Sequence, residues 1–427
     1  MKKIAVVDGV RTPFIKAWTL FDAIPAQKLG AMCVTELLQR TEIDPRLIDE
    51  VIIGCVGQPI DAANVARVIS LYAGVPKDKK AYTVNRNCAS GFESVTSAAE
   101  KILTGQDEVV IAGGAESMSN APLVFTKESA GIFMKLSKAK TLVQRLQVLA
   151  QFRPRHFAPA SALQCALTDP VCGLNMGQTA EVLAKKFGIS REKQDAFALA
   201  SNQKVIAARA KLREEMMTVH VPPSYEKFVQ DDNGARENQT LEMLAKLKPV
   251  FDRRSGSVTA GNSSQITDGA CALLLMPEDK ARAMGYEILG TIAAYDYAGL
   301  EPSEMGLGPV FAIRKVLKRA GMTLRDIELF EINEAFAVQV LACTEALASR
   351  KFSEDHFGES QAVGEIDPAL LNVNGGGIAL GHPVGVSGSR LILSCLKEMK
   401  RRSLSRGLAA LCIGGGQGGA VLLERQS

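Results

Sequence analysis

The segment Leu38-Gln-Arg-Thr-Glu-Ile-Asp-Pro-Arg-Leu-Ile48 aligns without a gap with Leu317-Lys-Arg-Ala-Gly-Met-Thr-Leu-Arg-Asp-Ile327. Each copy is followed by a short apolar run that is typical of a buried strand, and the apolar runs that begin at Ile4 and Ile288 correspond as well. A pattern that returns in this way indicates that one supersecondary unit occurs twice along the chain. We therefore expect two similarly built halves.

Short apolar runs alternate with helical patterns through most of the sequence, which favours an α/β fold with helices on both faces of its sheets. The further runs are Val51 to Ile53, Val109 to Ala112, Ala272 to Leu275, Leu329 to Ile332, Ala409 to Ile413 and Ala420 to Leu423. The alternation is lost between about residues 120 and 251. We expect an N-terminal half of residues 1–280, with an inserted loop domain at about 120–251, and a C-terminal half of residues 281–427.

The insertion contains a basic stretch from Met134 to Leu149, in which Leu142, Leu146 and Leu149 share one face of a helix. Such a basic amphipathic helix is typical of a lid on the molecule's own dimer, or of a segment that docks on a partner or a membrane surface. The residues alone leave both interpretations open.

The composition of the 427 residues is that of a globular α/β protein, with 47% hydrophobic and 22% charged residues. The net charge of +4 is spread over 50 basic and 46 acidic residues, so the overall charge predicts no nucleic-acid partner. No apolar stretch is long enough to span a bilayer, and Asp8 and Arg11 interrupt the N-terminal run before it reaches signal-peptide length. Nine scattered cysteines, without a CxxC pair or a metal-ligand spacing, indicate reduced thiols, no metal site and a cytoplasmic location.

Cys88 lies in Asn85-Arg-Asn-Cys-Ala-Ser-Gly91, between an apolar run and a helical pattern from Phe92 to Leu103. A cysteine at a helix N-terminus feels the positive end of the helix dipole and nearby N–H groups, which lower its pKa. Cys88 is therefore a candidate nucleophile, although spacing alone favours a buried and inert cysteine.

His382 is one of four histidines and stands within Asn372-Val-Asn-Gly-Gly-Gly-Ile-Ala-Leu-Gly-His-Pro-Val-Gly-Val-Ser-Gly-Ser-Arg390. So many small residues indicate that the backbone approaches something closely, and Pro383 holds the histidine at the turn before a helix. We interpret His382 as a general base.

Three further motifs carry weaker signals. Leu411-Cys-Ile-Gly-Gly-Gly-Gln-Gly-Gly419 contains a formal GxGxxG, but the residues after it predict a strand, whereas a dinucleotide site needs a helix N-terminus. Its N–H groups suit an oxyanion instead. Taken alone, Glu331-Ile-Asn-Glu-Ala-Phe-Ala337 is typical of a helix start with Asn333 as the N-cap. The stretch Ser257-Val-Thr-Ala-Gly-Asn-Ser-Ser-Gln-Ile-Thr-Asp-Gly-Ala270 suits a turn, or a surface against which a nucleotide-bearing ligand lies.

In this order and at these separations, NCASG, TAGNSS with a following DGA, NEAFA, NGGGIALGHPVGVSGSR and CIGGGQGGA resemble the motifs of the thiolase superfamily over nearly the whole chain. The basic insertion, Leu174 to Glu181 and Leu244 to Phe251 are most similar to the thiolase subunit of the fatty-acid β-oxidation trifunctional complex. The resemblance implies the thiolase fold, in which two βαβαβαββ-type halves form a five-layer αβαβα sandwich. It also implies a homodimer or dimer of dimers, with a hydratase/dehydrogenase α subunit as a partner.

The resemblance further implies an acyltransferase that cleaves 3-ketoacyl-CoA with CoA into acetyl-CoA and a shortened acyl-CoA, with CoA as a substrate and no cofactor. Cys88, activated by His382, would attack the 3-keto carbon, and Cys412 would protonate the departing enolate. His382 and a water held by Asn333 would stabilise that enolate, while the N–H groups of Cys88 and Gly414 would stabilise the tetrahedral intermediate.

By the same resemblance Ser264 and Arg236 match positions that contact CoA. Met176, Phe251 and Phe336 match positions that line the pantetheine and acyl pocket. Short-chain members often carry a histidine at the position of Asn175, and this departure favours longer acyl chains.

Other functions compete with this one. A biosynthetic acetyl-CoA acetyltransferase would form acetoacetyl-CoA with the same residues. A condensing ketoacyl synthase is less favoured, because those enzymes usually pair the cysteine with two histidines or a His/Asn set, and only His382 stands in a motif here. From another class, the chain would be chiefly an assembly subunit whose insertion, near residues 134–155, docks a hydratase/dehydrogenase partner or contacts a membrane peripherally.

Overall fold

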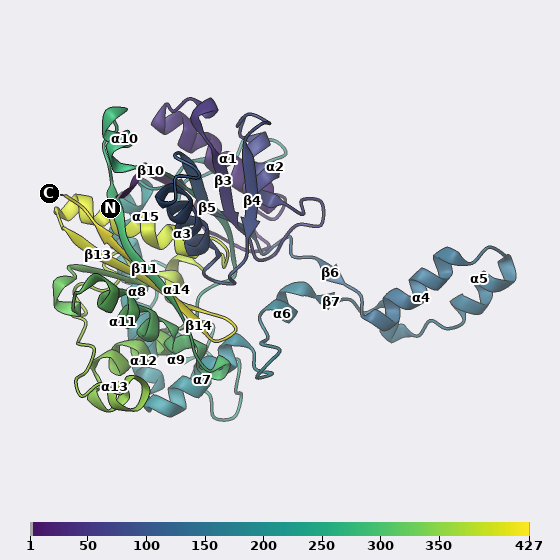
Figure 1. Cartoon of the computed structure of the whole chain (residues 1–427). Coiled ribbons are helices and arrows are strands. Elements are labelled where there is room, and N and C mark those ends of the chain that lie inside the picture. Colours follow the sequence, from purple (N-terminus) through teal and green to yellow (C-terminus); the bar gives the residue numbers. More distant parts are fainter. Residues whose placement is uncertain (1–2, 427) are drawn as a thin grey trace.

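The computed structural model of this protein describes residues 3–426, so the outermost ends of the two predicted halves lie outside the described residues. Its main strands follow the order β12-β13-β14-β11-β1-β10-β5-β3-β4 in one continuous sheet (Figure 1). These strands are β1 (Ile4–Arg11), β3 (Glu50–Gly54), β4 (Lys80–Val84), β5 (Val110–Ser117), β10 (Thr267–Pro277), β11 (Gly290–Gly299), β12 (Leu329–Ile332), β13 (Arg406–Ile413) and β14 (Gln417–Glu424). The short strand β2 (Ile15–Lys16) pairs with β10.

The sheet consists of two half-sheets that join where β1 pairs antiparallel with β11, with Ile4 opposite Ile292. From this junction the order is β1-β10-β5-β3-β4 on one side and β11-β14-β13-β12 on the other. A parallel bridge between Phe330 and Leu371 lies beside β12, where β4 lies beside β3 in the first half. The two halves therefore have the same strand order.

The internal repeat holds residue by residue. Helix α1 (Ala26–Thr41) ends at Glu42, which has a left-handed φ of 51°, and α11 (Gly308–Ala320) ends at the aligned Gly321, with a φ of 65°. The 3-10 turns Pro45–Leu47 and Leu324–Asp326 follow at aligned positions, and β3 and β12 then begin at aligned residues. The predicted pair of similar halves is confirmed.

Helices cover the half-sheets so that the described residues form the expected five-layer sandwich. Helices α1 and α2 (Val65–Tyr72) pack on the outer face of the first half-sheet, and α11 packs on the outer face of the second, beside α12 (Ala337–Ala348). Between the half-sheets lie α3 (Ser90–Leu103) and α15 (Ser387–Arg402), which contact each other. Buried apolar clusters fill the gaps between the layers. Strand β10, which has helices on both faces, is buried at every residue and is apolar from Gly269 to Pro277.

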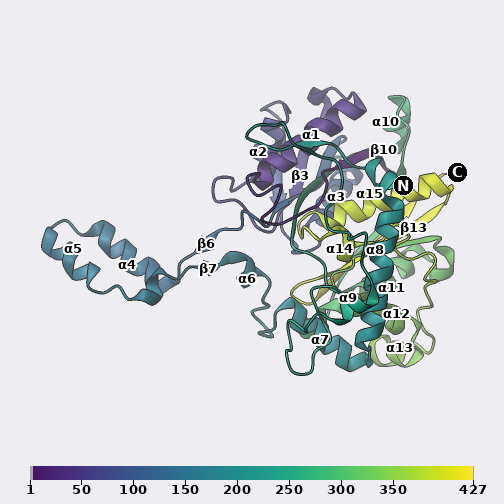
Figure 2. The same ribbon diagram turned by 180° about the vertical axis from the view of Figure 1, so that it is seen from behind.

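The insertion has two parts with different surroundings. Residues 123–161 form a slender arm that projects from the body (Figures 1 and 2), with α4 (Lys127–Lys138) and α5 (Leu142–Leu149) at its tip and the paired strands β6 (Leu123–Val124) and β7 (Ala160–Ser161) at its base. The second part packs against the body through α7 (Met176–Phe187), α8 (Arg191–Arg213) and α9 (Leu241–Ala245). The basic stretch of residues 134–149 is therefore divided between two helices, because Thr141 begins α5 with a capping box that involves Gln144.

Two further observations concern the predicted organisation. The expected boundary between residues 280 and 281 falls within α10 (Glu278–Ala283) and stays a prediction. In residues 3–426 we find no helix that combines the length and the apolar character needed to cross a membrane.

Candidate active site

A cavity of about 790 Å³ opens between the two halves and the insertion. It brings together residues that are far apart in the sequence, because the turn before α3, the loop before α15 and the end of β13 all reach it. Of the residues predicted from the sequence, the cavity is lined by Cys88, His382, Cys412, Ser264, Met176, Phe251 and Phe336. The side chains of Asn333 and Asn87 lie directly behind this lining, with Asn333 against His382 and Asn87 against Gly414.

Cys88 lies in the turn between β4 and α3, and its side chain is partly exposed to the cavity. The N–H groups of Gly414 and of Cys88 itself hydrogen-bond to its sulfur and lower the pKa of the thiol, but burial outweighs them and the pKa is raised. The N–H groups thus act in the direction that we expected, but the expected lowering of the pKa as a whole is wrong, because the low polarity of the surroundings disfavours the thiolate more than the N–H groups favour it. Cys88 rests as a thiol and needs a base.

His382 is buried, with 6% of its surface exposed. Burial, aided by the positive charge of Arg390, lowers the pKa of the imidazole to about 3, so the ring is neutral at neutral pH. We assign the ring proton to Nδ1, which lies 2.6 Å from Ser387 Oγ, because the Ser387 hydroxyl donates to the carbonyl of Pro383 at 3.3 Å. The unprotonated Nε2 is therefore free to act as a base.

Asn333 follows β12 and is fully buried, with its Nδ2 atom 3.5 Å from Nε2 of His382. Its Oδ1 atom is buried and has no hydrogen-bond partner among the described residues, which is unusual and marks a position suited to a polar ligand or a water. The alternative role as an N-cap does not hold, because α12 begins only at Ala337 with Phe336 as its N-cap.

Cys412 is the penultimate residue of β13 and is almost completely buried. Burial and the neighbouring Cys88 and Cys343 sulfurs raise the pKa of its thiol well above the ordinary value, so the group holds its proton. The turn that follows requires glycine at Gly415 and Gly416, which have φ values of 88° and 72°. As expected, β14 is a strand, so this glycine-rich turn has no dinucleotide-site geometry.

Glu116, at the end of β5, was not identified from the sequence although it organises the site. Its buried carboxylate accepts hydrogen bonds from the N–H groups of Val56 (3.0 Å), Gly57 (2.8 Å) and Gly385 (2.9 Å). Gly385 belongs to the loop that carries His382. Glu116 therefore fixes that loop to both β5 and the loop after β3.

The rim of the cavity carries positive charge that the motifs revealed only in part. Arg236 is exposed and does not line the cavity, whereas Lys16 does. The pKa of Lys16 is lowered mainly by burial and further by the positive charge of Arg236. Ser264 is fixed through its N–H group, which donates to the carbonyl of Ala335 at 2.9 Å. The neighbouring Ala17 and Trp18 line the same cavity and stand in none of the motifs found in the sequence.

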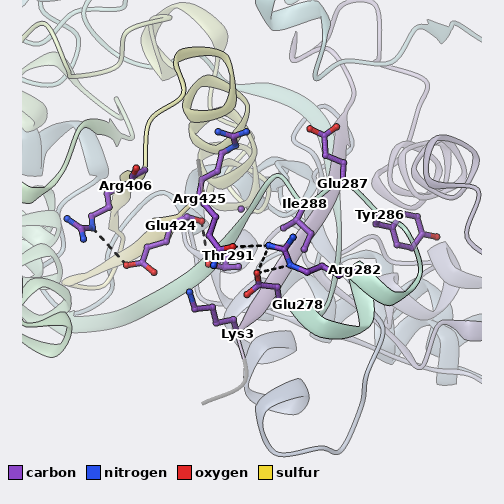
Figure 3. Close-up of a pocket in the computed structure, with 13 residues that line it drawn as sticks. Lys3, Glu278, Arg282, Tyr286, Glu287, Ile288, Thr291, Arg406, Glu424 and Arg425 are labelled. Carbon is purple, nitrogen blue, oxygen red and sulfur yellow. Dashed lines mark hydrogen bonds and ion pairs between the residues drawn. The ribbon is translucent and has the colours of Figure 1, made fainter.

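A second hollow, of about 460 Å³, lies where β1, β11, β13 and β14 meet, away from these residues (Figure 3). Two of its arginines face carboxylates: Arg282 contacts Glu278 at 2.7 Å, and Arg406 contacts Glu424 at 4.0 Å. Because these ion pairs leave little uncompensated charge and neither a cysteine nor a histidine lines the hollow, it is not the candidate active site.

Comparison with known proteins agrees with this geometry. The family model described as the thiolase N-terminal domain matches residues 4–279, and the thiolase C-terminal domain matches residues 286–425. The chain is 45% identical to a 3-ketoacyl-CoA thiolase of Pseudoalteromonas translucida (strain TAC 125), over 99% of this chain and 97% of that protein. It is 44% identical, with the same coverage, to a 3-ketoacyl-CoA thiolase of Shewanella sp. (strain ANA-3).

Solved structures are similar over the whole chain as well. Human mitochondrial 3-ketoacyl-CoA thiolase has a TM-score of 0.85 at 36% identity, with 100% of this chain and 99% of that chain covered. An acetyl-CoA acetyltransferase of Bacillus anthracis has a TM-score of 0.86 at 35% identity, with 99% of each chain covered. The resemblance inferred from the five motifs is confirmed: this chain belongs to the thiolase family.

Proposed function

We propose that this chain is a 3-ketoacyl-CoA thiolase, an acyltransferase that uses CoA to cleave 3-ketoacyl-CoA into acetyl-CoA and a shortened acyl-CoA. The observation that carries the proposal is a neutral His382 imidazole, with Nε2 unprotonated, in one cavity with the thiols of Cys88 and Cys412. A base of this kind can take the proton of a thiol as it attacks a carbonyl carbon.

In the first half-reaction, Cys88 Sγ attacks the 3-keto carbon while His382 takes the thiol proton. The C2–C3 bond then breaks, which leaves an acyl thioester on Cys88 and the enolate of acetyl-CoA. Cys412 supplies a proton to C2 of the enolate, a role that suits a thiol whose high pKa keeps it protonated. In the second half-reaction, CoA sulfur attacks the thioester carbon, Cys88 leaves, and the protons return to the two cysteines.

Two oxyanions need stabilisation during these steps. The N–H groups of Gly414 and Cys88 point to the sulfur of Cys88, so they are well placed for the oxygen of a carbon bonded to it. His382 and a water on Asn333 would serve the enolate oxygen, since the buried Asn333 side chain adjoins His382.

The substrate would enter with its CoA part against Ser264 and towards the exposed Arg236, where phosphates find opposite charge. Met176, Phe251 and Phe336 would line the pantetheine and acyl pocket. CoA acts as a substrate in this scheme, and the steps need no further cofactor.

Mass spectrometry after incubation with 3-ketohexadecanoyl-CoA, without free CoA, tests the mechanism. We expect a tetradecanoyl adduct on Cys88 that is absent from Cys88→Ala and retained in Cys165→Ala, because Cys165 is exposed. An adduct on another residue, or one that survives Cys88→Ala, would refute the role of Cys88.

Chain length separates the degradative function from biosynthesis of acetoacetyl-CoA, which remains the second candidate because the Bacillus anthracis acetyltransferase is equally similar in structure. Asn175 favours longer chains, and its side chain is occupied in a capping box with Gln178 at the start of α7. Thiolysis of acetoacetyl-CoA far faster than of 3-ketohexadecanoyl-CoA would favour the acetyltransferase instead.

Assembly belongs to the proposal as well. The edge strand β4 ends the sheet and leads directly into the Cys88 turn, so a second copy that pairs along this edge would give the homodimer, or a dimer of dimers. Free cysteines, including the exposed Cys165, suit the reducing cytoplasm and a place in fatty-acid β-oxidation there. Light scattering of the purified protein measures the oligomer, and a monomer would refute this part.

The arm is the proposed docking element. Its aromatic rings pack on one another, as Phe133 does on Phe152 at 4.9 Å, while α5 exposes Leu142 (73%) and Leu146 (57%) beside basic residues. An apolar helix face flanked by lysine and arginine binds anionic membrane surfaces.

Sedimentation with vesicles of phosphatidylglycerol or phosphatidylcholine tests this docking. We expect binding to the anionic vesicles only, lost in the double variant Leu142→Ser and Leu146→Ser and kept in Leu71→Ser, because Leu71 is an exposed leucine on α2. If vesicle binding is unchanged but a hydratase/dehydrogenase α subunit no longer co-purifies, the arm docks that partner instead of a membrane.

A further inference from the structure

Besides Met176, Phe251 and Phe336, the lining of the active-site cavity includes two stretches of different polarity, which we call its polar wall and its apolar wall. The polar wall carries Ser263, Ser264 and Gln265. The other is apolar: Cys88 packs against a cluster of Ala17, Met118 and Val384, which also touches Ile266 and Leu163 near the base of the arm. A ligand with a polar and an apolar part, joined at Cys88, would therefore be sorted between the two walls.

Trp18, the only tryptophan of the chain, ends the apolar wall. Its side chain lines the cavity while 60% of the residue remains exposed. Its backbone has a φ of 60°, a left-handed conformation that bulky residues rarely adopt. Such conformations concentrate at ligand-binding positions, where the surrounding structure holds them in place.

The surroundings that hold Trp18 are hydrogen bonds to a buried carboxylate. The N–H group of Trp18 donates to Ser119 Oγ at 2.7 Å, and both the hydroxyl and the N–H group of Ser119 donate to the fully buried Asp268. The hydroxyl of Thr19 closes the turn by donating to the carbonyl of Lys16 at 2.5 Å. The backbone of the turn is thus fixed, and the exposed indole is the part that is free to meet a ligand.

We infer that Trp18 is the outer end of a subsite for the distal methylenes of a long acyl chain, which runs from Cys88 past Met118 and Ala17. The inference rests on the proposed function, because the acyl thioester on Cys88 is its starting point. Pantetheine carries amides that need hydrogen-bond partners and so follows the polar wall. An acyl chain has only methylenes, which gain by leaving water for the apolar wall and the indole. A chain too short to reach Trp18 gains nothing from it.

The first test compares chain lengths in Trp18→Gly, since glycine adopts a positive φ without strain. We expect kcat/KM for 3-ketohexadecanoyl-CoA to fall about tenfold, and kcat/KM for 3-ketohexanoyl-CoA to stay within about twofold. The melting temperature should be unchanged or higher, so that unfolding cannot explain the loss. Equal losses for the two substrates would overturn the inference.

Tyr225 offers a matched control. It is also an exposed aromatic residue with a positive φ, 58°, but it lies in the hairpin between β8 (Val219–His220) and β9 (Phe228–Val229) and does not line the cavity. Tyr225→Gly should leave both substrates unaffected. A chain-length effect in this variant equal to that of Trp18→Gly would overturn the inference.

The second test uses the fluorescence of Trp18 in the unmodified protein, with CoA, hexanoyl-CoA and palmitoyl-CoA as probes. Palmitoyl-CoA should shift the emission to shorter wavelength because the acyl chain removes water from the indole, whereas CoA and hexanoyl-CoA should not. An equal emission shift with CoA would mean that Trp18 contacts the nucleotide part of the ligand instead of the acyl chain. No emission shift at saturating palmitoyl-CoA would mean that Trp18 does not contact the ligand at all. This readout needs no turnover, so a protein that gives the palmitoyl-CoA shift but cleaves no 3-ketoacyl-CoA refutes the proposed function alone.

Discussion

At Cys88 and His382, burial acts on two neighbouring side chains in opposite directions. It raises the pKa of the thiol and lowers the pKa of the imidazole, because in each case the charged form is the one that loses solvation. The pair therefore rests as a thiol beside a neutral ring. Charge develops only as the thiol attacks, when hydrogen-bond donors such as the N–H group of Gly414 can stabilise it.

His382→Gln should remove a pH dependence of stability that the buried ring contributes. The unfolded chain binds a proton at this residue below its ordinary pKa of 6.5, whereas the folded chain binds it only below about 3. Between these values the unfolded state holds more protons, so this group lowers the free energy of unfolding by about 1.4 kcal/mol for each pH unit that the pH falls. Urea unfolding across this range measures the slope in both proteins.

The matched control is His220→Gln, which changes an exposed histidine outside the cavity. It should keep the wild-type slope. Parallel stability curves for the wild type and His382→Gln would contradict the buried neutral ring.

Glu116→Gln should disturb the loop of His382 without touching the substrate. A glutamine side chain presents only one acceptor oxygen to three N–H groups, so at least one of the bonds from Val56, Gly57 and Gly385 is lost. We expect kcat to fall about 10- to 100-fold with little change in KM, and the free energy of unfolding to fall by about 2 kcal/mol. The control is Glu108→Gln, at an exposed ion pair with Lys280, which should alter neither kcat nor the free energy of unfolding. A change in KM alone for Glu116→Gln would argue against a positioning role.

The proposed catalytic side chains were found from the sequence because each stands in a dense local motif, and the structure places Cys88, His382 and Cys412 in one cavity. Glu116 could not be predicted, since its role comes from N–H groups that lie about 60 and 269 positions away in the sequence. The direction of the pKa shift of Cys88 was also out of reach, because burial depends on packing that no motif of seven residues reveals.

Among the elements, those of the repeat were predictable and those of the insertion were not. The start of β12 follows from that of β3 because the same helix, turn and strand pattern recurs in both halves. The arm shows the opposite case. Its leucines suggest one amphipathic helix, but the chain turns at Lys140 and Thr141 and builds a helical hairpin held by its own aromatic residues.

Removal of the arm should leave the stability of the body unchanged. Leu123 lies opposite Ser161 and Val124 opposite Ala160 in the ribbon at its base, so residues 125–159 can be replaced by a short Asn-Gly turn. The packing of α4 and α5 is internal to the arm, so the body should lose no buried apolar surface. Scanning calorimetry should show the same melting temperature, within about 2 °C; a large decrease would mean that the arm braces the body.

For the whole molecule, the contact between α3 and α15 is the critical one, since α3 follows Cys88 and α15 follows the loop that carries His382, the two residues to which we assign catalysis. The two backbones approach so closely that a Cβ atom at Gly388 would lie 2.4 Å from the backbone N of Phe92, and one at Gly91 would lie 2.7 Å from the backbone N of Ser389. The central layer, and with it the distance between Cys88 and His382, depends on this contact.

Gly388→Ala should therefore push the two helices apart. We expect the free energy of unfolding to fall by about 1–3 kcal/mol, because the added methyl group overpacks a filled core. We also expect kcat to fall by at least the factor that this energy represents, about fivefold or more. The control is Gly131→Ala in α4, where a Cβ atom meets nothing within 4 Å. This variant should be neutral or slightly stabilising, and wild-type activity in Gly388→Ala would show that the spacing of the helices is not critical.

The repeat also has an evolutionary consequence. The junction of β1 with β11 relates two copies of one unit, in which the turn before α3 corresponds to the turn before α15. An ancestral unit that paired with an identical copy of itself could place only like beside like at this meeting point, thiol with thiol or imidazole with imidazole. A single chain that carries both copies is free of that restriction. One copy can then supply the proposed nucleophile, Cys88, and the other the proposed base, His382.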